Sequence, residues 1–412
     1  MKDPHWTRVW LAMAVAFAVS AVVLEALSFS VAYVVIGRVA GMGGSLFERA
    51  GTIYSTVGFG WHAQRQNKAA VPLSMAPDKL LGYRLRPNTD YPTPDLQGGQ
   101  IWPLTSNRYG FIANVGAADR ETTPDARTLN IFITGGSTVQ GIGASANSAT
   151  IASRLEANLN ALKDPRATET RAIRAINAGV GGYNATQEMV YLATELRFLH
   201  PTVVVMLNGI NESSEDALVG REYHLIPGTK PHPLDALPVP LMPATQSVIS
   251  ALFRKLGLID RDDTAASGLP PVLRPRSERY AAIVATAAGI ANDAGAAFVY
   301  VLQPTTGIGA RSPSTAEQRR SAAMGLNDPQ RWSQYADRMN EFYAEMRHRI
   351  AELEKRHPGS AFVDGSLILD REAGDVYWDP RHYTDLGQQA IANFLTEQLR
   401  ARYWERLGLV RD

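Results

Sequence analysis

Four short segments of this sequence carry side chains that could do chemistry together. They are Gly135-Gly136-Ser137-Thr138, the glycine-rich NAGVGGYN at 177–184, NGINE at 208–212, and Asp379-Pro380-Arg381-His382. The first three follow apolar runs, and the fourth precedes a helical periodicity near the C-terminus. A serine hydroxyl, an imidazole and a carboxylate form an acyl-transferring triad when the imidazole removes the serine proton and the carboxylate orients the imidazole.

The spacing of Asp379 and His382 is the most informative of these patterns. In a turn, two intervening residues let the carboxylate meet Nδ1–H of the imidazole, which leaves Nε2 free to accept a proton from Ser137. Asp385 is a competing acid, but we expect it to be the N-cap of the last helix. We therefore expect Asp379 to orient His382.

The other three segments are weaker signals when taken singly. Gly135 and Gly136 allow a tight strand-to-helix turn that exposes the Ser137 hydroxyl, although such turns are more often structural turns or helix caps. The glycines at 179–182 permit a backbone N–H to point into a cleft, and the Asn211 side chain could donate to a developing oxyanion. Ordinary loop hydrogen bonding is the alternative for both.

Composition excludes several classes of function. Lys and Arg number 41 against 40 Asp and Glu, which leaves a net charge of +1 and no global field that would attract nucleic acid. The absence of cysteine excludes disulfides, thiolate zinc sites and thiol nucleophiles. The chain has no phosphate-loop lysine after Gly136, no GxSxG pentapeptide and no regular zinc-ligand spacing. We expect neither a metal nor an organic cofactor.

Short apolar runs alternate with helical periodicities along most of the chain. We expect strands starting at Asn130 and over Arg174–Val180, Val203–Leu207, Ala297–Leu302 and Ala361–Leu369. We expect helices over Thr150–Leu162, Thr186–Leu199, Ser277–Ala294, Asp328–Arg356 and Asp385–Arg402. On the fourth helix a stripe of large apolar residues predicts a core-facing side: Trp332, Tyr335, Met339, Phe342, Met346, Ile350 and Leu353. The alternation predicts a flavodoxin-like, three-layer α/β/α fold with a five-stranded parallel sheet and a site at the carboxyl ends of its strands.

The regions outside this pattern are expected to have other roles. Residues 9–36 are apolar enough to span a bilayer, and Lys2 and Arg8 in residues 1–8 favour a cytoplasmic N-terminus. A cleaved signal peptide is the alternative. Residues 37–125 form an irregular leading segment that we expect to pack on a catalytic domain at 126–405. A Pro-rich insertion at about 212–270, with one helix at Ser247–Leu256, interrupts that domain.

In their order and content, the four segments resemble blocks I, II, III and V of the SGNH (GDSL-like) serine hydrolases over about residues 126–403. LGYRLRPN at 81–88 and SNRYGFIA at 106–113 resemble the leading segment of bacterial membrane-anchored members. The resemblance implies Ser137 as nucleophile, His382 as base and Asp379 as its partner. It also implies an oxyanion hole made by the N–H groups of Ser137 and Gly182 and the side chain of Asn211. Two residues depart from the family's commonest motifs. Gly136 stands where the GDS motif has Asp, and Glu212 stands where the GxND motif has Asp.

The resemblance implies a membrane-anchored esterase that hydrolyses acyl esters, acetyl first, on a small molecule or an envelope glycan through an acyl-serine. Two alternatives stay open. The same triad could pass the acyl group to a glycan hydroxyl, as an O-acyltransferase supplied by a membrane partner. The domain could instead be a non-catalytic module of an envelope assembly.

The apolar segment leads to a prediction about location. We expect the chain to fractionate with the inner membrane, and a reporter enzyme fused after Asp412 to be active only on the periplasmic side. Deleting residues 1–36 should release the protein from the membrane fraction. Full-length protein in the soluble fraction would contradict the expectation.

Overall fold

The computed structural model describes residues 75–78, 80–93, 102–115, 124–166, 168, 171–213, 275–323 and 329–410, all within one compact unit. The expected membrane anchor at 9–36 and the helix at Ser247–Leu256 lie outside these residues. The expected insertion also lies outside them except for Glu212 and Ser213. Within the described ranges, no helix combines the length and apolar character needed to cross a bilayer.

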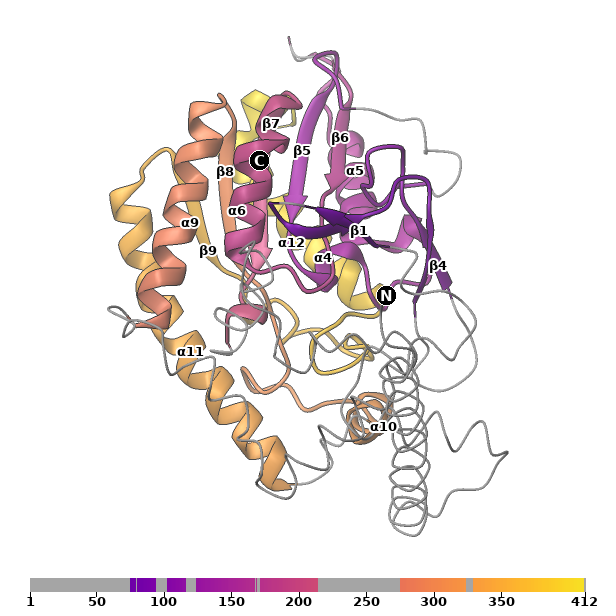
Figure 1. Ribbon diagram of the computed structural model, residues 1–412, viewed down its shortest axis with the longest axis vertical. Helices are drawn as coiled ribbons and strands as arrows, with labels where there is room; N and C mark the ends of the chain where they lie inside the picture. The colour runs from indigo at the N-terminus through magenta and orange to yellow at the C-terminus, as the bar shows by residue number, and fades with distance from the viewer. Residues whose placement is uncertain are drawn as a thin grey trace, which may run out of the picture. The chain divides into compact units, whose positions relative to one another are not determined.

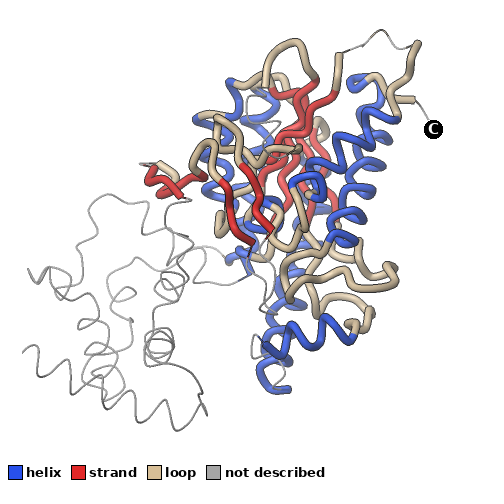
Figure 2. The backbone as a smooth tube through the Cα atoms, turned by 90° about the vertical axis from the view of Figure 1, so that its right-hand side faces the viewer, coloured by secondary structure: helices blue, strands red, loops and turns tan. Residues whose placement is uncertain are grey.

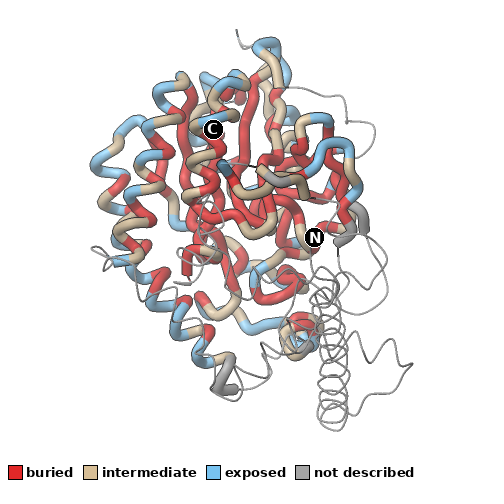
Figure 3. The backbone as a smooth tube through the Cα atoms, viewed as in Figure 1, coloured by how far each residue is buried: buried red, intermediate tan, exposed pale blue. Residues whose placement is uncertain are grey.

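A five-stranded parallel sheet lies at the centre of this unit (Figure 1). Its strands are β5 (Leu129–Thr134), β6 (Ile173–Asn177), β7 (Pro201–Asn208), β8 (Ala297–Leu302) and β9 (Ser360–Asp364). They are ordered β6-β5-β7-β8-β9, and every residue of β5 and β8 is buried, as in a sheet covered on both faces (Figure 3). The expected parallel α/β architecture is confirmed.

Helices cover both faces of the sheet (Figure 2). Buried residues of α6 (Ala185–Thr194), α9 (Arg276–Asp293) and α11 (Pro329–Arg356) share one apolar cluster with one face of the sheet. Those of α5 (Ile151–Ala161) and α12 (Asp385–Leu407) share a second cluster with the opposite face. The expected stripe of α11 is buried in the first cluster from Tyr335 to Leu353, and Trp332 packs against its edge. The prediction that it faces the core is confirmed.

The described part of the leading segment forms two antiparallel hairpins. Their strands are β1 (Met75–Asp78) with β2 (Gly82–Leu85), and β3 (Asp90–Thr93) with β4 (Trp102–Thr105). Leu85, Leu104 and Phe111 are buried in the same cluster as Phe132 of β5. Ile112 bridges to Asn177 at the end of β6, which is an edge strand of the sheet. The leading segment therefore packs on the sheet, and the stretch after β4 pairs with its edge strand.

Several element boundaries differ from the sequence expectation. β6 ends at Asn177 rather than Val180, because the chain there turns in against α4 (Ser137–Gln140). At Gly179 the approach is so close that a Cβ would lie 2.3 Å from the Gln140 nitrogen. β9 ends at Asp364 rather than Leu369, since hydrogen-bonded turns begin at Gly365.

Among the helices, α6 stops at Thr194 and a short 3-10 turn, Leu196–Phe198, completes the expected length. The last helix, α12, is longer than expected and runs to Leu407. Helix α10 (Thr315–Ala323) was not expected, because its sequence is polar and has no apolar periodicity.

The buried stripe of α11 leads to a stability prediction. Phe342→Ala should lower the free energy of unfolding by about 3–5 kcal/mol, because the ring is fully buried and its loss leaves a cavity. The neighbouring Glu341 is exposed, and Glu341→Ala should change stability by no more than about 0.5 kcal/mol. Urea unfolding of both variants measures the difference, and equal effects would contradict the assigned face of α11.

Candidate active site

Three side chains from two distant segments form a continuous hydrogen-bonded chain beyond the carboxyl edge of the sheet. Ser137 Oγ lies 2.7 Å from His382 Nε2, and His382 Nδ1 lies 2.6 Å from Asp379 Oδ2. Ser137 is the first residue of α4, which follows β5 after two glycines. The structure thus brings together the three residues that the sequence singled out, in the arrangement of a serine-hydrolase triad.

The turn at Asp379–His382 brings the Asp379 carboxylate to the His382 ring although only two residues separate them. Asp379 Oδ1 accepts hydrogen bonds from the backbone N–H groups of Arg381 (2.7 Å) and His382 (2.8 Å), so the carboxylate closes the turn on itself. The Trp378 N–H donates to the His382 carbonyl at 2.8 Å across the same turn. Oδ2 is left to face the imidazole.

Asp379 is buried, and burial alone would raise its pKa. The hydrogen bond and charge of His382, with the two backbone donors, outweigh burial and hold the pKa of Asp379 below its usual value. The carboxylate therefore stays ionised at neutral pH and can stabilise an imidazolium. Its contribution to stability is present above the unfolded pKa and is lost as the pH falls through the lowered folded pKa.

The loop after β8 is hydrogen-bonded to the Asp379–His382 turn. The Pro380 carbonyl accepts hydrogen bonds from the hydroxyls of Thr305 (3.1 Å) and Thr306 (3.0 Å). Tyr383 donates its hydroxyl to the Pro304 carbonyl at 2.7 Å. The triad turn is therefore attached to the sheet through β8 as well as through α12.

Helix α10, which the sequence did not predict, is hydrogen-bonded to the backbone just before the Asp379–His382 turn. Glu317 is buried and accepts the N–H groups of Val376 and Tyr377 at 2.9 Å each. Its burial opposes ionisation, but the two-point contact with Arg311 and these backbone donors hold the pKa of Glu317 below its usual value. Arg320 donates to the Asp375 side chain and to the Tyr377 carbonyl. Hydrogen bonds and ion pairs of Glu317 and Arg320 thus attach this polar helix, which has no apolar stripe in its sequence.

Asp385 does not cap the last helix, and that expectation was wrong. Thr384 is the N-cap of α12, with its hydroxyl accepting from the Gly387 N–H. Asp385 is the first helical residue and instead accepts hydrogen bonds from the backbone N–H (2.8 Å) and the hydroxyl of Ser145. Its carboxylate is engaged away from the imidazole, which leaves Asp379 as the partner of His382.

Of the expected oxyanion donors, one is the N–H of Ser137 itself, and the other two come from segments packed against residues 136 and 137. The Ser137 N–H opens α4, where the first amides of a helix have no acceptor within the helix. Gly182 has a positive φ of 83°, which glycine adopts without strain, and a Cβ on the preceding Gly181 would lie 3.8 Å from Ser137 Cβ. Asn211 Nδ2 donates one hydrogen to the Tyr183 carbonyl at 2.7 Å, and an amide group of this kind carries a second hydrogen.

Gly136 provides the space that Asn211 occupies. A Cβ at Gly136 would lie 2.6 Å from Asn211 Nδ2 and 3.3 Å from the Tyr183 carbonyl oxygen. Gly136 stands where the family that the sequence resembles has Asp, and its missing side chain leaves room for the Asn211 amide. The structural reason is steric, since a side chain at this position must displace the amide.

Two buried carboxyl groups that the sequence did not assign to the site lie under these loops. Glu212 accepts the N–H groups of Ala185 (2.6 Å) and Gly209 (3.0 Å), and so ties the loop after β7 to the start of α6. Glu188 accepts from Asn208 Nδ2 at 3.0 Å. Burial first, and the nearby Glu212 second, raise the pKa of Glu188 well above its usual value, which favours the neutral acid there. Glu212 thus keeps a structural role in the position where the resembling family has Asp.

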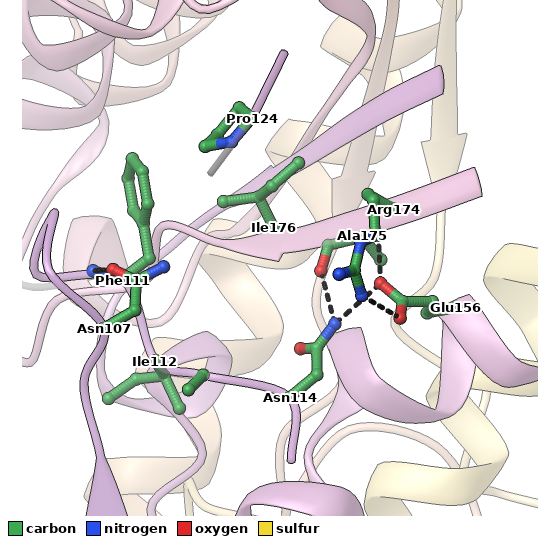
Figure 4. A pocket seen from close by; sticks show the side chains of 10 residues that line it. Asn107, Phe111, Ile112, Asn114, Pro124, Glu156, Arg174, Ala175 and Ile176 are labelled. Carbon is green, nitrogen blue, oxygen red and sulfur yellow. Dashed lines mark hydrogen bonds and ion pairs between the residues drawn. The ribbon is translucent and has the colours of Figure 1, made fainter. Parts of the chain in front are cut away.

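A separate pocket lies beside β6, and none of the candidate triad residues lines it (Figure 4). Asn114 Nδ2 donates to the Ala175 carbonyl (2.9 Å) and to Glu156 (2.8 Å), and Glu156 accepts the Ala175 N–H at 3.0 Å. Arg174 pairs with Glu156 at 3.1 Å. These contacts satisfy the backbone of an edge strand, which is a structural task. Across the described ranges, no group of acidic and histidine side chains is arranged to hold a metal ion.

Comparisons with known proteins give similarity at the level of solved structures. No protein-family model and no curated protein sequence matches the chain. Among solved structures, LAE5, an alpha/beta hydrolase from the metagenome of Lake Arreo, is 16% identical, with a TM-score of 0.37 over 71% of this chain and 100% of that chain. A catalytic mutant of Axe2, an acetylxylan esterase from Geobacillus stearothermophilus, is 12% identical, with a TM-score of 0.37 over 68% and 95%. The acetyl xylan esterase AlAXEase is 11% identical, with a TM-score of 0.36 over 66% and 100%.

The lack of room for a Cβ between Gly136 and Asn211 leads to a prediction about the expected oxyanion hole. Asn211→Ala should lower kcat for a short ester by about 10²- to 10³-fold with KM within a few fold, because the donated bond strengthens only as charge develops. Gly136→Ala should lower kcat in the same direction by displacing the amide. The double variant should be no slower than Asn211→Ala, since the displaced group is already absent.

Steady-state kinetics per folded molecule, with melting temperatures from the same preparations, measure this coupling. Additive losses in the double variant would show that Gly136 acts independently of Asn211. An Asn211→Ala protein that is destabilised but has normal kcat would remove Asn211 from the site.

Proposed function

We propose that this protein is a serine esterase of the SGNH type. The single observation that carries the proposal is the unbroken chain from Ser137 Oγ through both nitrogens of His382 to Asp379 Oδ2. A serine, an imidazole and a buried ionised carboxylate in this order constitute the machinery for nucleophilic acyl transfer. The Ser137 N–H, the Gly182 N–H and the Asn211 amide suit the oxyanion that such a reaction creates.

The proposed reaction begins when His382 Nε2 takes the Ser137 proton and Oγ attacks the ester carbonyl carbon. The carbonyl oxygen becomes an oxyanion that accepts hydrogen bonds from the N–H groups of Ser137 and Gly182 and from Asn211 Nδ2. Collapse of this intermediate expels the alcohol, which receives the proton from His382, and leaves an acyl-serine. Water, deprotonated by His382, then attacks the acyl-serine carbonyl carbon to give a second tetrahedral intermediate. Its collapse releases the acid and expels Ser137 Oγ, which receives the proton back from His382. Asp379 remains ionised throughout.

We propose a short acyl group, acetyl first, carried by a small molecule or an envelope glycan. Support comes from the resemblance of the four sequence segments to the SGNH hydrolases. We further propose that residues 9–36 anchor the protein in the inner membrane with the catalytic domain on the periplasmic side, where glycan esters would be within reach. The apolar character of that segment and the flanking Lys2 and Arg8 support this placement.

Ser137→Ala should reduce hydrolysis of p-nitrophenyl acetate by on the order of 10⁴-fold or more, because removing a triad nucleophile disables the whole unit. The same change should abolish covalent labelling by a fluorophosphonate. Ser333→Ala is the matched control, since Ser333 is an exposed serine on α11. That variant should hydrolyse and label like the wild type.

The melting temperature of Ser137→Ala should remain close to that of the wild type. Retention of more than a few per cent of wild-type turnover would refute Ser137 as nucleophile. A panel of acyl lengths, run with and without a sugar acceptor, then separates hydrolysis from acyl transfer.

A further inference from the structure

We propose that Tyr83, in strand β2 of the leading segment, is a positioning residue that aims the Gly182 N–H into the oxyanion hole. This inference rests on the proposed esterase function. Tyr83 lies outside all four segments that carry the candidate chemistry, in the LGYRLRPN stretch at 81–88 of the leading segment. Its contacts with the glycine turn after β6 carry the argument.

The first contact is a hydrogen bond from the Tyr83 hydroxyl to the Gly181 carbonyl at 2.9 Å. The Gly181 carbonyl and the Gly182 N–H belong to one planar peptide unit, in which the C=O and N–H bonds point in opposite directions. Holding the oxygen therefore sets the direction of the N–H. A hydroxyl on one side of the turn thus aims a donor on the other side.

This peptide unit needs such a restraint because glycines flank it on both sides. Gly182 has φ of 83°, and neither Gly181 nor Gly182 has a Cβ to bias the backbone, so rotation of the unit between them costs little by itself. The neighbouring amides are already engaged, with the Gly181 N–H on Gln140 Oε1 (2.7 Å) and the Tyr183 N–H on the Val180 carbonyl (3.0 Å). Tyr83 supplies the restraint on the unit in between.

A second contact links Tyr83 to Asn211, the side-chain donor of the expected hole. The Tyr183 hydroxyl donates to the Tyr83 carbonyl, and the two rings meet edge to face with centroids 5.5 Å apart. The Tyr183 carbonyl in turn accepts Asn211 Nδ2 at 2.7 Å. Tyr83 and Tyr183 thus hold the turn from both ends, and Asn211 is attached to the same turn.

Strand β2 is itself firmly attached at this point, so it can serve as a support. Gln187 Nε2 donates to the Leu81 carbonyl at 2.8 Å, and Arg84 pairs with Glu195 at the end of α6. Arg84 also lies over the Tyr191 ring, with its guanidinium carbon 5.7 Å from the ring centroid. The Tyr83 hydroxyl therefore extends from a hairpin that is fixed to the same helix that follows the glycine turn.

The test compares Tyr83→Phe with Tyr91→Phe. Tyr91 is also in the leading segment, but its hydroxyl donates to the Arg86 carbonyl at 3.0 Å, within that segment. Both variants lose one hydroxyl and keep the ring. Turnover of p-nitrophenyl acetate by the full-length protein is normalised to active sites titrated with a fluorophosphonate, so that any unfolded fraction does not enter kcat.

We expect Tyr83→Phe to lower kcat about tenfold with KM within about twofold, because a misaimed donor loses part of the 10²- to 10³-fold effect of an oxyanion donor. Affinity for an alkyl trifluoromethyl ketone, which forms a tetrahedral adduct on the serine, should fall by the same factor. Tyr183→Phe, which releases the opposite end of the turn, should move both quantities in the same direction. Tyr91→Phe should leave both within twofold of the wild type.

The outcomes are distinguishable from those of the esterase proposal. A wild-type protein that neither turns over esters nor labels at Ser137 overturns both the esterase and the role of Tyr83. An active wild type in which Tyr83→Phe matches Tyr91→Phe in kcat and ketone affinity overturns the role of Tyr83 alone. A Tyr83→Phe variant with a lowered melting temperature but unchanged kcat per titrated site also overturns it, since that pattern marks a purely structural residue.

Discussion

The parallel pairing of β5 with strands on both of its sides determines where the candidate reactive groups of this protein lie. β6 and β7 flank β5 and run in the same direction, so the turns after all three strands meet at one edge of the sheet. Ser137, the Gly181–Gly182 turn and Asn211 leave the sheet at that edge. The connection from β6 to β7 passes across β5, which creates a switch in strand order, the place where open α/β sheets receive ligands.

The groups that meet at this edge are held by different physical means. Asp379 remains a carboxylate because His382 and two backbone donors offset its burial. Glu188 is driven toward its neutral form by burial and by the neighbouring charge of Glu212, which is itself tied to two backbone N–H groups. Asp379 thus keeps its charge because several hydrogen-bond donors surround it. Fully hydrogen-bonded polar networks of this kind also make the loops around them more rigid.

Elements outside the four chemical segments supply much of that rigidity. Helix α10 presents Glu317 to the backbone that precedes the triad turn, and the loop after β8 holds the Pro380 carbonyl. The leading segment contributes Tyr83 to the glycine turn. An oxyanion hole works by having its donors in place before charge develops, so residues that restrain those donors contribute to its effect.

The sequence alone determined the layered fold, the core-facing stripe of α11 and the identity of the residues brought together as a candidate triad. These features depend on local periodicity and on residue types next to strand ends, which are written along the chain. Only the tertiary structure decided that Thr384 rather than Asp385 caps α12, that the polar α10 docks on the triad turn, and that Gly136 makes room for Asn211. It also decided that the Tyr83 hydroxyl donates to the Gly181 carbonyl, 98 positions away in sequence. Contacts of this kind arise when loops that are distant in sequence are folded against one another, and no local pattern encodes the distance between their atoms.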